Sequence, residues 1–190
     1  MEAETRPEPR PDRSARRERK ARPLDAARLD ELALAYVARF ATSQGKLAAY
    51  LKRKLRERGW AGEGEPDLAG LVARLVRVGY LDDAAYAKMR GANLLRRGLG
   101  ARRIMADLSA AGLDEETREG ARPDHAAERG ALLALAKKRR LGPFFSGPKD
   151  RAVLERHMAV LLRAGHRLDS ARELVNLPSA EAAEEWAEGE

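Results

Sequence analysis

Apolar residues recur three and four positions apart along most of this chain, which is the spacing of amphipathic helices. In the segment 66–80, Leu68, Leu71, Val72 and Leu75 form a complete stripe of this kind behind a capping residue, Asp67. Strict alternation of apolar and polar residues, the mark of half-buried strands, is nearly absent. The pattern therefore predicts an all-α protein.

The same spacing predicts helices throughout residues 23–177 and assigns a core face to most of them. These are 23–41 (Leu29, Leu32, Tyr36, Phe40), 46–60 (Leu47, Leu51, Leu55), 66–80, 83–97 (Ala85, Met89, Ala92), 101–113 (Ile104, Leu108, Ala111), 123–140, 149–166 (Leu154, Met158, Leu161) and 169–177.

Four of these helices end in the same way, with a leucine four residues before a glycine and a bulky side chain after it. A glycine there adopts the left-handed conformation of a helix C-cap. Gly59, Gly112 and Gly165 are spaced 53 residues apart, and Gly79 is the fourth. Equal spacing predicts tandem three-helix repeats. We expect units at 24–81, 82–123 and 124–178, between a disordered leader (1–23) and an acidic tail (179–190).

Charge is distributed unevenly along the chain. The whole sequence has a net charge of +7, whereas residues 179–190 contain five glutamates and no basic residue. A basic body suggests a polyanionic partner, although it also serves solubility. The tail is either a solvated end or a competitor for the surface that binds nucleic acid.

Candidate chemistry is sparse. There are no cysteines and three histidines, none of them at metal-ligand spacing. Asp82 and Asp83 precede a helix directly, where carboxylates cap free N–H groups, so they predict a helix start rather than a catalytic pair. We therefore expect no enzyme, cofactor or metal. No apolar run reaches the roughly 20 residues that span a bilayer, so we expect a cytoplasmic protein that contacts no membrane.

Basic residues on helix faces are the remaining candidates for function. Three clusters are expected either to be solvated separately or to line a common groove for phosphates or an acidic protein surface. Their members are Lys52, Arg53 and Arg56; Arg96, Arg97, Arg102 and Arg103; and Lys137 and Lys138.

Three stretches resemble the bacterial RecX regulatory proteins: TSQGKLAAYLKRKLRERGW (42–60), LVRVGYLDDAAYAKMR (75–90) and GLGARRIMADLSAAGL (98–113). The resemblance implies an elongated, curved array of three-helix repeats. It also implies a monomer that binds RecA filaments on single-stranded DNA, most simply to inhibit ATP hydrolysis and strand exchange. The three basic clusters are then candidate contacts to the filament or its DNA.

Two other interpretations remain open. The chain is alternatively a direct DNA- or RNA-binding protein with a helix-turn-helix-like element, although the acidic loop 61–67 is long for such a turn. The third alternative is a helical adaptor whose charge serves solubility.

Overall fold

The protein is described by a computed structural model covering residues 22–189, in which ten α-helices and one short 3-10 helix are joined by loops. The all-α prediction is confirmed. The helices are α1 (Ala26–Arg39), α2 (Gln44–Arg58), α3 (Leu68–Arg77), α4 (Asp83–Arg96), α5 (Ala101–Ala110), α6 (Glu115–Glu119), α7 (His125–Arg139), α8 (Arg151–Arg163), α9 (Leu168–Asn176) and α10 (Ala180–Glu188), with η1 (Gly142–Phe144) after α7.

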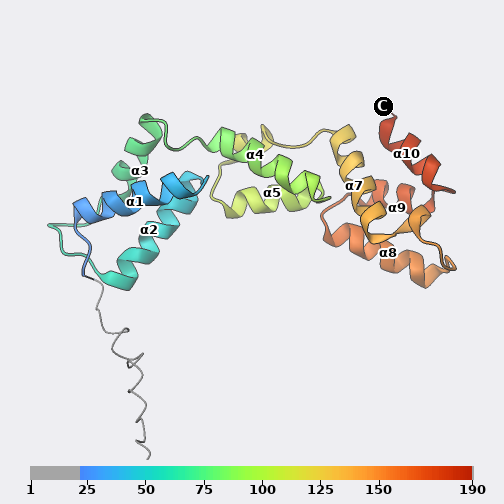
Figure 1. Ribbon diagram of the computed structural model, residues 1–190, viewed down its shortest axis with the longest axis horizontal. Coiled ribbons are helices and arrows are strands. Elements are labelled where there is room, and N and C mark those ends of the chain that lie inside the picture. Colours follow the sequence, from blue (N-terminus) through green and yellow to red (C-terminus); the bar gives the residue numbers. More distant parts are fainter. Residues whose placement is uncertain (1–21, 190) are drawn as a thin grey trace, which may run out of the picture.

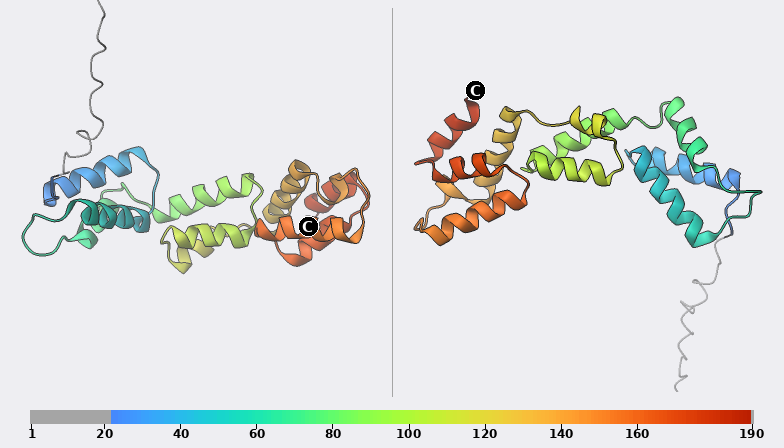
Figure 2. Two further views of the ribbon diagram at one scale, coloured as in Figure 1. Left: turned by 90° about the horizontal axis from the view of Figure 1, so that it is seen from below. Right: turned by 180° about the vertical axis from the view of Figure 1, so that it is seen from behind.

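The helices form three consecutive groups in an elongated, curved array (Figure 1; Figure 2 shows two further views). Each group has a hydrophobic core of its own, centred on leucines such as Leu51 in the first, Leu108 in the second and Leu161 in the third. We call them the first unit (α1–α3), the second unit (α4–α6) and the third unit (α7–α9). In the second unit the third helix, α6, is a single short turn of five residues.

Most helices begin at an aspartate or serine whose side chain accepts a hydrogen bond from a backbone N–H in the first turn. Asp82 accepts from Ala85 N at 2.8 Å, and Asp83 accepts from Gln44 N at 2.9 Å, at the start of a helix in the first unit. The prediction that this acid pair marks helix starts is therefore confirmed. Similar caps are made by Asp25, Ser43, Asp67, Asp114, Asp124, Asp150 and Ser179.

The predicted core face of α4 is wrong. Met89 is 40% exposed, and both alanines predicted beside it are exposed too. The buried face carries Tyr86 and Leu94 instead. Between them, Arg90 makes a paired hydrogen bond to Asp107 of α5 at 2.7 and 2.8 Å. Alanine and methionine are weak indicators of burial, and the leucine and tyrosine that fill more volume decide which face packs inward.

The expectation of a solvated acidic end is also wrong. Residues 180–188 form α10, which packs along α7 (Figure 1). Ala183 is fully buried, and Trp186 packs against the core of the third unit. The spacing of Ala180, Ala183 and Trp186 gives this helix an apolar face, while its glutamates point to solvent. The predicted disordered leader lies almost entirely outside the described residues, and its character stays a prediction.

The middle helices of the three units stand end to end. The C-terminus of α8 meets the N-terminus of α5, and the C-terminus of α5 meets the N-terminus of α2, so that three helices form one broken row along the array (Figure 1). At the free end of this row, Gly59 O accepts a hydrogen bond from Leu24 N at 2.9 Å. The segment before α1 thereby satisfies a backbone carbonyl at the C-terminal end of α2.

Candidate functional site

The contact between α5 and α8 joins the second and third units through backbone groups. Gly100 N donates to Ala164 O at 3.0 Å, and Arg102 N donates to Gly165 O at 3.2 Å. Helix ends have unpaired N–H and C=O groups, and here two ends satisfy each other. The positive end of one helix dipole also faces the negative end of the other, which is favourable. The junction is thus specified by main-chain geometry.

Glycine is required at the centre of this junction. Gly165 has a φ of +93°. A Cβ atom built on it would lie 2.5 Å from the backbone nitrogen of Arg103. A side chain at Gly165 would therefore both strain the backbone and push the two helices apart.

A buried histidine also contacts the segment that leads into α5. His166, directly after Gly165, is 2% exposed, and its Nε2 lies 2.9 Å from Gly98 O. Burial lowers the pKa of His166, because the charged imidazolium loses its hydration there. The neutral ring donates its Nε2 proton to this carbonyl. His166 is therefore a structural residue.

Six basic side chains, from α5, α7, α8 and the residue after α4, surround the end of α8. All six are exposed, and none of them takes part in an ion pair with any acidic residue between positions 22 and 189. We call this set the junction patch: Arg97, Arg102, Arg103, Lys138, Arg139 and Arg163.

Two hollows lie within the junction patch, and Arg163 lines both of them. The first, of about 440 Å³, opens between α5 and α8 beside Arg102 and Arg103. The second, of about 340 Å³, opens between α7 and α8 beside Arg97 and Lys138. No carboxylate lines either hollow. A concave surface with unpaired cations and no acid suits a polyanion such as a phosphodiester backbone or an acidic protein segment.

The structure brings together only part of the predicted set. Arg97, Arg102, Arg103 and Lys138 meet in the junction patch. Arg96 instead donates a hydrogen bond to Asn93 on its own helix. Lys137 faces α10, where its Nζ lies 2.5 Å from a carboxylate oxygen of Glu184.

The remaining cluster lies far from the junction patch. Lys52, Arg53 and Arg56 are on α2, at the opposite end of the array from α8 (Figure 1). Arg53 Nε is 3.6 Å from Glu57 Oε1, so part of its charge is offset within the same helix. These residues therefore lie apart from the junction patch, and their role as contacts stays a prediction.

Sequence reasoning missed one member of the junction patch, Arg163, and did not single out another, Arg139, from its cluster. Arg163 lies two residues before Gly165, in the last turn of α8. A basic residue two positions before a glycine that ends a helix predicts a cation at the helix end, and this pattern could have identified Arg163. Arg139 was one of four consecutive basic residues, and only the packing of α7 selects which of them face the junction.

Within the described residues no group of three or more His, Asp or Glu side chains is placed to hold a metal ion. None of the helices described here is long and apolar enough to cross a membrane. The described surface thus offers basic hollows between helical units. These features define a class, that of helical repeat proteins with an exposed basic surface.

Comparison with known proteins identifies the family. A family model for RecX, described as its second three-helix domain, matches residues 82–121. The regulatory protein RecX of Myxococcus xanthus (strain DK1622) is 33% identical over 184 residues, covering 92% of this chain and 97% of its own length. That of Mycobacterium sp. (strain JLS) is 32% identical over 157 residues, covering 80% of this chain and 84% of its own. This chain belongs to the RecX family.

A solved structure supports the fold. The crystal structure of RecX from Lactobacillus salivarius matches with a TM-score of 0.64 at 18% identity, covering 79% of this chain and 94% of that chain. At this identity the likeness concerns the arrangement of helices, which confirms the tandem three-helix architecture.

Proposed function

We propose that this protein binds RecA filaments on single-stranded DNA and lowers their rate of ATP hydrolysis and strand exchange. It acts in the cytoplasm as a monomer and catalyses no reaction itself. Membership of a family of regulatory proteins supports this proposal, since the relatives are named regulatory protein RecX. The elongated array also suits a long groove better than a small ligand.

The observation that carries the proposal is the junction patch. Its six cations have no acidic partner in the described chain, so a polyanion can bind there without displacing an internal ion pair. An exposed cation in water needs no protein partner, but six of them around two hollows create a locally positive potential. A filament of protein and DNA offers both phosphates and acidic side chains to such a surface.

The test is a titration of the protein into RecA filaments on single-stranded DNA, with ATP hydrolysis as the readout. The patch variant carries Arg102→Glu, Arg103→Glu and Arg163→Glu. The control variant carries Lys88→Glu, Arg156→Glu and Arg172→Glu, which are exposed, lie outside both hollows and change the net charge equally. We expect the patch variant to lose inhibition at concentrations where the wild type and the control still inhibit.

Three results would contradict the proposal. Equal inhibition by the patch variant and the wild type would show that the junction patch is not the contact. Equal loss in the control would show that only net charge matters. An unchanged hydrolysis rate with the wild type, together with strong salt-sensitive binding to bare DNA, would favour the direct nucleic-acid-binding alternative.

Lys52, Arg53 and Arg56 form a second, separate contact in this proposal, since they lie on the first unit. Reversing these three charges tests them independently of the junction patch. Because the two groups lie in different units, we expect their effects on filament affinity to be additive in free energy.

A further inference from the structure

A row of aromatic side chains lies on the first unit, between α1 and α2. The rings of Tyr36 and Tyr50 are stacked, with centroids 4.3 Å apart and planes inclined by 22°. Phe40 continues the row, with its centroid 5.2 Å from that of Tyr36 and an interplanar angle of 50°. Offset and tilted contacts of this kind are the favoured geometries of aromatic pairs.

The two ends of the aromatic row differ in exposure. Tyr36 and Tyr50 pack against the core of the first unit, which anchors the inner end. Phe40 is 51% exposed, because α1 ends at Arg39 and Phe40 occupies the cap position with extended backbone. The sequence placed Phe40 on the core face of its helix, and this prediction is wrong. An anchored row with an exposed last ring is an aromatic platform facing water.

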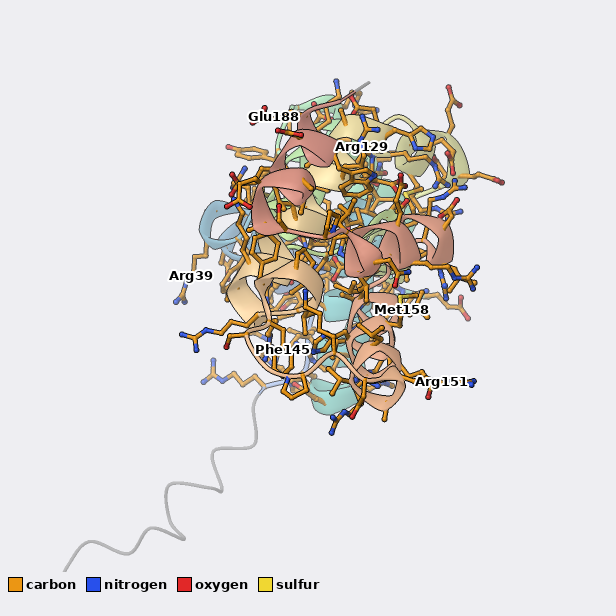
Figure 3. All side chains as sticks on the ribbon, turned by 90° about the vertical axis from the view of Figure 1, so that its right-hand side faces the viewer. Arg39, Arg129, Phe145, Arg151, Met158 and Glu188 are labelled. Carbon is orange, nitrogen blue, oxygen red and sulfur yellow. The ribbon has the colours of Figure 1, made fainter. Side chains whose placement is uncertain are left out.

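Cations flank this platform. The Arg39 guanidinium lies 5.7 Å from the ring centroid of Phe40, and that of Arg53 lies 5.5 Å from the ring centroid of Tyr50. Arg39 makes no ion pair with a described residue, and it projects away from the ribbon into solvent (Figure 3). A guanidinium that lies over an exposed ring and has no ion pair among the described residues provides a phosphate contact next to a stacking surface.

We propose that Phe40, backed by Tyr36 and Tyr50, stacks on an unpaired nucleobase while Arg39 and Arg53 contact the adjoining phosphates. Aromatic platforms next to cations are the general means by which proteins hold single-stranded nucleic acid, because every base has a face on which a ring can stack. The bases of a duplex are already stacked on one another and have no free face to offer. The proposed ligand is therefore single-stranded DNA or RNA, and the site requires no recombinase.

The test compares two oligonucleotides of equal length and charge, one of thymidines and one of abasic sites. We expect the wild type to prefer the thymidine oligonucleotide. Phe40→Ala should weaken its binding about tenfold, which corresponds to the loss of one stacked base. The affinity for the abasic oligonucleotide should be unchanged, because the phosphate contacts remain. Phe40→Trp should keep the preference and show quenching of the added tryptophan fluorescence on binding.

Leu34→Ala is the matched control, since Leu34 lies on the same helix and is 44% exposed but belongs to no aromatic pair. The proposal is overturned if Phe40→Ala leaves the preference for bases unchanged, or if Leu34→Ala reduces it equally. It is also overturned if Phe40→Ala impairs binding to RecA filaments while binding to the free oligonucleotide is unaffected, which would indicate a protein partner. Failure of this test leaves the hydrolysis experiment on the junction patch untouched, since the readouts and the residues differ.

Discussion

The two junctions between units share an end-to-end packing of helices but differ in their hydrogen-bond donors and in the side chains around them. At the junction of the second and third units, two N–H groups of α5 bind carbonyls of α8. At the junction of the first and second units, Ser43 Oγ donates to Ala111 O at 2.5 Å, and Gly45 approaches Gly112 closely. Both place the N-terminus of one middle helix against a glycine that ends another. The connection is thus a repeated structural element.

The two junctions differ in whether the basic side chains around them are paired. Near the first junction two basic side chains are paired: Lys46 Nζ donates to the Tyr86 hydroxyl at 2.6 Å, and Arg90 is bound to Asp107. Around the second junction six cations have no acidic partner in the part of the chain that the structure describes. The end-to-end packing of helices therefore determines where the units contact each other. The side chains around each junction determine whether unpaired cations are exposed there.

The largest expected effect comes from a methyl group at the junction glycine. Gly165→Ala should lower the free energy of unfolding by about 3 kcal/mol, because a left-handed alanine costs about 1 to 2 kcal/mol and the Cβ overlaps the facing helix. Thermal or urea denaturation measures this. Gly79→Ala is the control, since Gly79 has a φ of +80° but its Cβ would meet no atom within 4 Å. Equal losses at both positions would refute the packing role of Gly165.

An intermediate effect concerns pH at the second junction. The pKa of His166 is lowered by burial, so the unfolded chain binds more protons than the folded one as pH falls below about 6.5, the usual histidine value. Its contribution to stability is complete above that value and decreases below it. Between pH 7.5 and 5.5 the wild type should lose about 1 kcal/mol more than His166→Gln, as measured by urea unfolding. Identical pH dependence would mean that His166 is not held neutral.

The smallest effect is expected at the paired charges near the first junction. The hydrogen bond from Arg90 lowers the pKa of Asp107, so its stabilisation is present above the usual carboxyl pKa and is lost as pH falls below it. Asp107→Asn should cost about 0.5 to 1 kcal/mol at pH 7, and this difference should shrink below about pH 4. Denaturation at pH 7 and pH 3 measures it. Glu57→Gln, at an exposed ion pair, should produce no resolvable change, and a deficit of Asp107→Asn that persists at pH 3 would contradict the assignment.

Local sequence signals located most of the helices and their ends. Leucine spacing placed the core faces of α3 and α5 correctly, and the capping aspartates marked where helices start. The same reasoning failed for α4, where alanine and methionine gave no clear stripe, and for α10, whose four glutamates outweighed one buried alanine and one tryptophan. The overall composition of a segment indicates how polar its exposed surface is. Whether the segment packs against another helix depends on the few residues that face that helix.

The candidate site was predictable only in part. Basic residues that are close in sequence were recognised as clusters. Which of these clusters lie together in space was not predicted. Arg163 and Arg102 are far apart in the chain, and only the end-to-end contact of α8 and α5 brings them to the same hollow. Lys137 and Lys138 are neighbours in sequence, yet one faces α10 and the other faces the junction patch, because adjacent helical positions diverge by about 100°.

The sequence by itself determined the helical class, the 53-residue repeat and its glycine ends, because helix periodicity and left-handed caps are properties of a few consecutive residues. The tertiary structure decided which cations converge, that the acidic segment packs on α7, and that Phe40 ends its aromatic row in solvent. Each of these depends on contacts between residues distant in the chain. Such contacts follow from how whole helices pack, and no short stretch of sequence encodes them.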